Sequence, residues 1–183
     1  MSILNYVNLA AESLDTNKTN RILIVDDEPR LRTSYAQLLS GDGRSIEQCA
    51  TGIAAQARLD KRDIDVVVLD LNLPDVSGIE IMQWIQQNHL DTSVVVFSAD
   101  EAINSAILAL RQGAFEFIRK CCDPDELISA VDRALDLRQM KREHTTLSAQ
   151  LEQSERMHRF LVEQSPDIIY TLDHEGRFVF INR

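Results

Sequence analysis

One run of residues, from Ile64 to Asp70, constrains the fold of this chain more than any other segment. Five of its seven residues are apolar, and four of those are β-branched. Such a run is typical of a strand that is covered on both faces within a parallel sheet. Because a carboxylate is costly to bury inside that layer, we expect Asp70 at the carboxyl end of the strand, where open α/β sheets place their ligand crevices.

Polar residues follow three other apolar runs in the same manner. These are Arg21–Val25 followed by Asp26 and Asp27, Ser93–Phe97 followed by Ser98, and Phe115–Arg119 followed by Lys120. The carboxyl ends of parallel strands lie at one edge of a sheet. We therefore expect three carboxylates, a hydroxyl and an amine to converge on one crevice.

Between residue 21 and about residue 136, strand-like runs alternate with segments of helical periodicity. The predicted strands are 21–25, 44–48, 64–69, 93–97 and 115–118, and the predicted helices are 28–40, 51–60, 77–88 and 101–112. This alternation predicts an α/β fold, with a parallel sheet, right-handed crossovers and helices on both faces.

Composition excludes several classes of function for this fragment. Its formal net charge of -10 argues against binding to nucleic acid. No stretch approaches the roughly 18 apolar residues of a membrane span, and no basic flank precedes an apolar run as in a secretory signal. We expect a cytoplasmic protein that binds no membrane. Residues 1–20 are expected to form a short helix or a disordered lead-in.

A long helix is predicted to begin at Pro124, because Asp123 suits the N-cap and acidic residues occupy the first turn. Further along, apolar residues recur in steps of three and four, and polar residues complete the stripe. The apolar positions are Leu137, Met140, Leu147, Leu151 and Leu161, and the polar ones are His144, Ser154 and His158. This imperfect heptad seam favours a parallel coiled coil and a homodimer. The alternative is an amphipathic helix that packs on its own domain.

Three clustered carboxylates repel one another unless a cation is present. Mg²⁺ suits Asp26, Asp27 and Asp70, because it prefers oxygen ligands, and the main-chain carbonyl of Asn72 is a further candidate ligand. An ionised carboxylate can also attack a phosphoryl group in line, while an amine and a hydroxyl neutralise the transferring oxygens. The residue types therefore match phosphoryl transfer to Asp70.

About residues 20–138 resemble the receiver domain of two-component response regulators. The matching segments are Ile22–Glu28, Val68–Gly78, Val96–Ala99 and Gly113–Lys120. The resemblance implies a flavodoxin-like doubly wound sheet of five parallel strands in the order 2-1-3-4-5, here with a long C-terminal helix. It implies Asp70 as the phosphoacceptor, Asp26 and Asp27 as holders of Mg²⁺, and contacts of Ser98 and Lys120 with the phosphoryl group.

Two positions bear on how far the resemblance extends. Phe117 matches the aromatic residue that turns inward when the switch hydroxyl, here Ser98, moves toward the phosphate, although plain core packing explains a phenylalanine equally well. Cys121 replaces the proline that usually follows the lysine. A non-proline cis bond costs about 3–4 kcal/mol, so we expect the Lys120–Cys121 bond to be trans.

The C-terminal segment resembles the start of a PAS sensor domain. Residues 167–173 and 178–181 read as two strands joined by a turn, and a lone hairpin is not stable in water. We therefore predict four parts: a lead-in (1–20), a receiver domain (21–137), a helical coiled-coil linker (138–162) and the truncated start of a PAS-like domain (163–183).

These features predict a phosphorelay receiver that accepts a phosphoryl group from a sensor histidine kinase or phosphotransfer protein and slowly hydrolyses it. The dimeric helix would relay the change to a PAS or output module, such as a histidine kinase or a cyclic-dinucleotide enzyme, beyond residue 183. One alternative is a receiver-like dimerisation scaffold that needs no phosphorylation. A small aspartyl-phosphate phosphatase is disfavoured, because Asn72 stands where such enzymes place a general acid.

Overall fold

The computed structural model describes residues 19–41, 43–99, 103–121 and 123–182. Its contacts divide the chain into two compact units, one ending at Arg138 and the other running from Gln139 to Arg183. Of the predicted lead-in, residues 1–18 lie outside the described residues. Among the described residues, no helix combines the length and the hydropathy that crossing a membrane requires.

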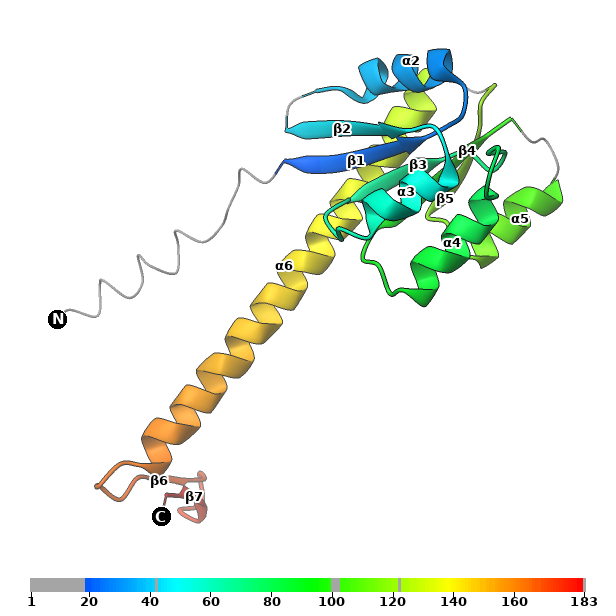
Figure 1. Cartoon of the computed structure of the whole chain (residues 1–183). Helices are drawn as coiled ribbons and strands as arrows, with labels where there is room; N and C mark the ends of the chain where they lie inside the picture. The colour runs from blue at the N-terminus through cyan, green and yellow to red at the C-terminus, as the bar shows by residue number, and fades with distance from the viewer. Residues whose placement is uncertain (1–18, 42, 100–102, 122, 183) are drawn as a thin grey trace. The chain divides into compact units, whose positions relative to one another are not determined.

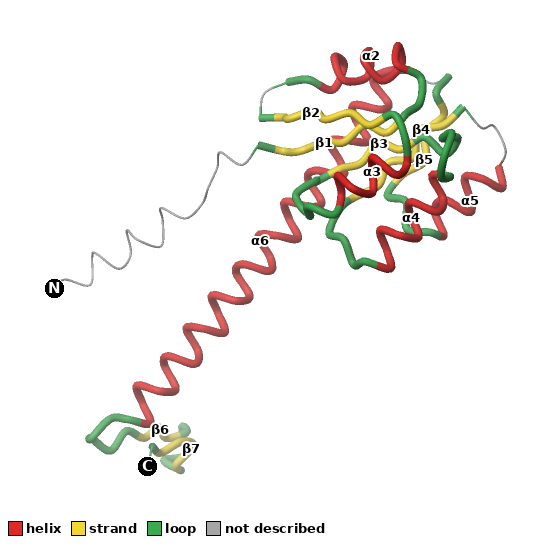
Figure 2. The backbone as a smooth tube through the Cα atoms, in the orientation of Figure 1, coloured by secondary structure: helices red, strands yellow, loops and turns green. Residues whose placement is uncertain are grey.

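The first unit is built on a sheet of five parallel strands (Figures 1 and 2). In chain order these are β1 (Asn20–Val25), β2 (Arg44–Cys49), β3 (Val66–Leu69), β4 (Ser93–Ser98) and β5 (Glu116–Arg119). Their order in the sheet is β2-β1-β3-β4-β5, and each neighbouring pair is parallel. The predicted flavodoxin-like fold is therefore confirmed.

Helices cover both faces of this sheet. They are α2 (Pro29–Leu39), α3 (Gly52–Leu59), α4 (Gly78–Gln87), α5 (Ile103–Arg111) and α6 (Pro124–Glu163). Side chains of β1 alternate between two apolar clusters, with Ile22 and Ile24 in one and Leu23 and Val25 in the other. The first cluster is closed by α2 and α6, and the second by α3, α4 and α5. This alternation is what a pleated strand covered on both faces requires.

The strands and helices predicted for the first unit match the observed ones to within one or two residues, whereas the strand predicted over 167–173 is shorter and begins three residues later, at Tyr170. Ser77 and Glu80 form a reciprocal capping box at the start of α4. Asp123 Oδ1 accepts a hydrogen bond from Asp125 N at the start of α6, over 3.1 Å. Residues 101 and 102, which begin one predicted helix, lie outside the described residues.

The strand predicted over 64–69 begins two residues later, and Asp65 lies at the amino edge of the sheet with only 1% of its surface exposed. Its carboxylate accepts a hydrogen bond from Arg21 N over 2.8 Å, and its Oδ1 lies 3.8 Å from Nε of the buried Arg138 on α6. Arg138 also binds the carboxylate of Asp91, at 3.0 Å from each oxygen. A buried ion pair thus joins α6 to the sheet where the first unit ends.

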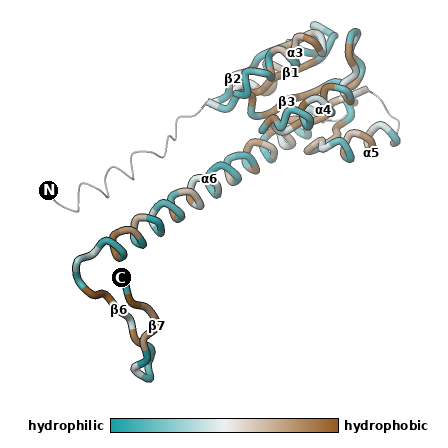
Figure 3. Tube along the Cα trace, turned by 60° about the horizontal axis from the view of Figure 1, so that its bottom comes forward, coloured by the Kyte–Doolittle hydropathy of each residue, from teal (hydrophilic) through white to brown (hydrophobic). Residues whose placement is uncertain are grey.

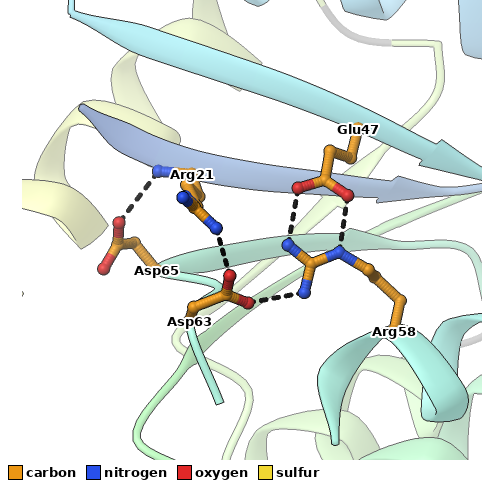
Figure 4. A network of polar contacts seen from close by, with 5 residues as sticks. All are labelled: Arg21, Glu47, Arg58, Asp63 and Asp65. Carbon is orange, nitrogen blue, oxygen red and sulfur yellow. Dashed lines mark hydrogen bonds and ion pairs between the residues drawn. The ribbon is translucent and has the colours of Figure 1, made fainter. Parts of the chain in front are cut away.

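A second charged network lies nearby and links two strands to α3 (Figure 4). Arg58 donates two hydrogen bonds to the carboxylate of Glu47, over 2.5 and 2.6 Å, and one to Asp63 over 2.5 Å. Arg21 forms a second ion pair with Asp63. The hydrogen bonds that Arg58 donates lower the pKa values of both carboxyl groups, and because Glu47 and Asp63 accept them, the pKa of Arg58 is raised.

The second unit holds the remainder of α6 and an antiparallel hairpin of β6 (Tyr170–Leu172) and β7 (Phe178–Ile181). The predicted hairpin is confirmed, and Asp173 shapes its turn by accepting from Glu175 N at 2.8 Å and Arg177 N at 2.9 Å. All side chains of both strands are exposed. Along this part of α6, apolar residues are scattered within a hydrophilic background (Figure 3), and only residues 160–162 form a consecutive apolar run.

Candidate functional site

Asp70 follows β3 at the carboxyl edge of the sheet, as predicted, and its surface is 5% exposed. Its main-chain N–H donates to Val25 O over 2.9 Å, and its Oδ1 accepts from Asn72 N over 3.2 Å. Gly78 packs directly against this turn, because a Cβ there would lie 2.5 Å from Asp70 O. The loop after Asp70 is thus bent back tightly toward the strand.

Asp26 and Asp27 follow β1, the strand beside β3. Asp26 is 3% exposed, its N–H donates to Cys49 O over 3.2 Å, and its Oδ1 accepts from Glu28 N over 2.9 Å. Asp27 is exposed. Asp26, Asp27 and Asp70 each offer a carboxylate oxygen, and these oxygens lie within 4.8 Å of one another. The convergence expected from the strand ends is therefore present.

Lys120 completes the cluster from the end of β5. Its Nζ lies 2.8 Å from Asp26 Oδ2 and 2.5 Å from Asp70 Oδ2. Burial by itself lowers the pKa of Lys120, but the hydrogen bonds to Asp26 and Asp70 outweigh it and the pKa is raised. No cis peptide bond occurs among the described residues, so the Lys120–Cys121 bond is trans, as expected. Loss of the proline therefore leaves the amine in the crevice.

Two other predicted site residues, Ser98 and Asn72, contact members of this cluster through their main chains, and Phe117 lies on β5. Ser98 ends β4 fully buried, and its main-chain O accepts from Lys120 N over 3.0 Å. Asn72 is exposed on the loop after Asp70. Phe117 is partly buried and packs against the apolar cluster closed by α3, α4 and α5. Their roles in phosphoryl contact, metal binding and switching stay predictions.

Two contacts at the site involve residues outside the predicted set. Arg32 on α2 donates from Nη1 to Asp26 O over 2.6 Å. Asp75, in the loop after Asp70, binds the first two amides of α3 at 2.8 Å each. Neither residue directly follows a buried strand, which is the signal that identified the aspartates and the lysine of the cluster. Their contacts arise because the tertiary fold brings separate segments together.

The site lies where the strand order reverses, between β1 and β3, which is the switch point at which open α/β sheets bind ligands. Fold and site together define a flavodoxin-like domain with a cluster of three aspartates and a lysine at its switch point. Residues 22–132, more than half of the chain, match the response regulator receiver domain. The chain belongs to this family, as its sequence motifs predict.

Individual relatives agree with this assignment. The chain is 35% identical over 124 residues to the regulatory protein AtoC of Escherichia coli, covering 68% of this chain and 27% of that protein. It is 35% identical over 118 residues to the transcriptional regulatory protein TcrA of Mycobacterium tuberculosis, covering 64% of this chain and 46% of that protein. The chain thus spans about a quarter to a half of the length of these curated relatives.

Among solved structures, the signal receiver domain of a putative LuxO repressor protein from Vibrio parahaemolyticus superimposes with a TM-score of 0.65 at 29% identity. The match covers 67% of this chain and 95% of that one. The similarity is therefore to an almost complete receiver domain.

Proposed function

We propose that Asp70 accepts a phosphoryl group from a phosphohistidine of a sensor histidine kinase or phosphotransfer protein. The observation that carries this proposal is the contact of the Lys120 ammonium with both Asp26 and Asp70, at 2.8 and 2.5 Å. It sets a positive charge beside the nucleophile, where the incoming phosphoryl oxygens need neutralisation. A scaffold that is not phosphorylated has no need of this arrangement.

The donor set at the crevice fits Mg²⁺. Three carboxylates face one ammonium, so these four side chains carry a net charge of -3 + 1 = -2, which a divalent cation offsets. Asp26, Asp27, Asp70 and the main-chain carbonyl of Asn72 would hold it, since Mg²⁺ prefers oxygen ligands and retains waters. When bound, Mg²⁺ supplies further neutralisation of the transferring phosphoryl oxygens.

The side chains of the site have distinct roles in the proposed reaction. A carboxylate oxygen of Asp70 forms a bond to phosphorus while the bond between phosphorus and the histidine nitrogen of the donor breaks. Lys120 and the Ser98 hydroxyl bind the transferred oxygens, and burial of Asp70 limits access of water to the acyl phosphate. Attack by water on phosphorus later releases phosphate and restores the carboxylate.

We also infer that α6 carries the change onward. The proposed parts are a receiver domain over 21–137, a dimeric linker over 138–162 and a PAS-like start over 163–183, in a cytoplasmic protein. The exposed seam residues Leu147 and Leu151, with 65% and 62% of their surfaces exposed, support a homodimer through this helix. Ser98 and Phe117 are the proposed switch between the site and the helix.

Phosphorylation by a small donor tests the assignment directly. With acetyl phosphate and Mg²⁺, the wild-type chain is expected to gain one phosphoryl group by intact mass spectrometry, and the adduct should be labile to hydroxylamine. Asp70→Asn removes the nucleophile and should abolish the gain. Asp60→Asn, an exposed aspartate at the end of α3, is the matched control and should react like the wild type. Equal labelling of Asp70→Asn would refute the proposal.

A further inference from the structure

The loop after Asp70 is anchored at both ends next to the acidic cluster. Asn72 N donates to Asp70 Oδ1 over 3.2 Å, and Gly78 N donates to Leu71 O over 3.0 Å. Between these anchors, the loop carries the Asn72 carbonyl that the proposed function assigns to Mg²⁺. The position of that carbonyl therefore depends on what holds the rest of the loop.

Asp75 holds the loop by binding the first turn of α3 with both carboxylate oxygens. Oδ1 accepts from Gly52 N and Oδ2 accepts from Ile53 N, each over 2.8 Å. Amides at the start of a helix lack partners within it, and the helix dipole favours an anion there. The N-cap residue, Thr51, accepts from Ala54 N at 3.3 Å. The first two amides are thus satisfied by a distant carboxylate.

The loop can approach α3 because residue 52 is a glycine. A Cβ at Gly52 would lie 2.9 Å from Ile81 Cδ1 on α4, and 3.0 Å from Cβ and 3.1 Å from O of Val76 in the loop, so a larger residue would have to displace both. The hydrogen bond from Ile53 N, followed by that from Gly52 N, lowers the pKa of Asp75. Its carboxylate is therefore an anion at neutral pH, and the clamp has its full strength there.

The contact also connects the two strands that carry the metal-binding aspartates. Asp26 N donates to Cys49 O, which lies two residues before Thr51, and Asp70 binds the other end of the loop. Asp75 completes this chain of contacts, because it joins the loop after Asp70 to the start of α3, which follows Cys49. A displaced loop would move the Asn72 carbonyl away from the carboxylates.

We infer that Asp75 is a positioning residue for the metal site: by clamping the loop to α3, it fixes the Asn72 carbonyl relative to Asp26 and Asp70 and strengthens Mg²⁺ binding. The inference rests on the proposed function. Residues that orient metal ligands commonly change metal affinity by about 10- to 100-fold when they are replaced. We expect the lower end of that range for one carbonyl ligand among several donors.

Titration calorimetry of the full chain with Mg²⁺ alone, without a phosphodonor, provides the test. Asp75→Ala is expected to bind Mg²⁺ about 10-fold more weakly than the wild type. Asp60→Ala, at the other end of α3, is the matched control and should bind like the wild type. Equal affinity of Asp75→Ala and the wild type would overturn the inference.

A second variant separates loop positioning from simple helix capping. Thr51→Asp, added to Asp75→Ala, places a stronger capping group at the N-cap without binding the loop. We expect it to restore the thermal stability of Asp75→Ala but not its Mg²⁺ affinity. Recovery of both would mean that Asp75 acts merely as a cap, and the inference would fail.

Mg²⁺ binding and phosphorylation of the wild type distinguish a failure of the proposed function from a failure of the inference about Asp75. If the wild type binds no Mg²⁺ and is not phosphorylated by acetyl phosphate, the proposed function itself fails. If the wild type binds Mg²⁺ and is phosphorylated but Asp75→Ala matches it in affinity, the inference alone fails.

Discussion

At the scale of single residues, the charged groups of the first unit act in sets whose members compensate one another. Lys120 lies between Asp26 and Asp70 at the carboxyl edge of the sheet, and Arg58 lies between Glu47 and Asp63. Both cations have raised pKa values, because hydrogen bonds to carboxylates favour their charged forms. The first set is nearly buried and contributes to the proposed chemistry, whereas the second is partly exposed and contributes to stability.

The Arg58 network predicts a pH-dependent contribution to stability. The folded-state pKa values of Glu47 and Asp63 are lowered, so these groups bind protons more weakly in the folded chain than in the unfolded one. Their contribution is present above the ordinary carboxyl pKa of about 4 and is lost as the pH falls through the lowered values. Because the carboxylates of the network are partly exposed, Arg58→Met should cost about 1 kcal/mol of unfolding free energy at neutral pH.

Urea unfolding at neutral pH and at about pH 3 measures this contribution. The difference between Arg58→Met and the wild type should shrink in acid. Lys61→Met, an exposed neighbour, serves as the control and should change stability little at either pH. A difference that grows on acidification would contradict the assignment.

At the scale of elements, α6 is held to the sheet by apolar packing and by ion pairs, among which the contact of Arg138 with Asp65 is buried. Leu127, Val131 and Ala134 lie fully buried in the cluster that α2 also covers. At the end of the first unit, Arg138 faces Asp65, and its Nε is buried without a hydrogen-bond partner among the described residues. The pair therefore fixes the last packed turn of α6, although burial of the Arg138 guanidinium carries a desolvation cost.

Removing Arg138 should be far more damaging than removing a surface arginine of the same helix. Arg138→Met removes the buried cation that faces the Asp65 carboxylate, and loss of one partner of a buried ion pair commonly costs roughly 3–5 kcal/mol. Arg133→Met is the matched comparison: it breaks an exposed pair with both oxygens of Glu116, each at 2.7 Å, and should change the free energy of unfolding little, because water screens an exposed ion pair. Denaturant unfolding of the two variants checks this order, and equal losses would contradict it.

At the scale of the whole molecule, the two units differ in how much apolar surface they bury. The first has two apolar clusters on opposite faces of its sheet. In the second, Met157, Phe160 and Leu161 are more than half exposed, as are Phe178 and Val179 on the hairpin. Exposed apolar surface of this kind favours association, and for α6 the heptad spacing points to a second copy of the chain.

Cysteine crosslinking tests the proposed dimer and its response to phosphorylation. In a background without the native cysteines, Leu147→Cys and Leu151→Cys should give disulfide-linked dimers on mild oxidation, because seam positions face each other in a parallel coiled coil. Ala149→Cys, between them on the opposite side of the heptad, is the control and should crosslink poorly. If α6 relays the signal, beryllofluoride with Mg²⁺ should change the yields at the seam, and unchanged yields would count against the relay.

Most of the architecture follows from local patterns in the sequence. Apolar runs such as that ending at Asp70, with helical segments between them, predicted all five strands of the sheet, because strand and helix periodicities are properties of neighbouring residues. Asp26, Asp70 and Lys120 were also predictable as one cluster, since carboxyl ends of parallel strands must share an edge. The order of the strands came from resemblance to the receiver family, not from these patterns.

Only the tertiary structure decided which distant residues stabilise this framework. Asp65 lies inside a run read as strand, yet the structure buries it beside Arg138, which α6 brings to the amino edge of the sheet. Asp75 resembles an ordinary loop aspartate until the fold places it against Gly52 and Ile53. The physical reason is the same in both cases: a local pattern reports which face a residue occupies, whereas the partner of a charged group is set by how separate elements pack.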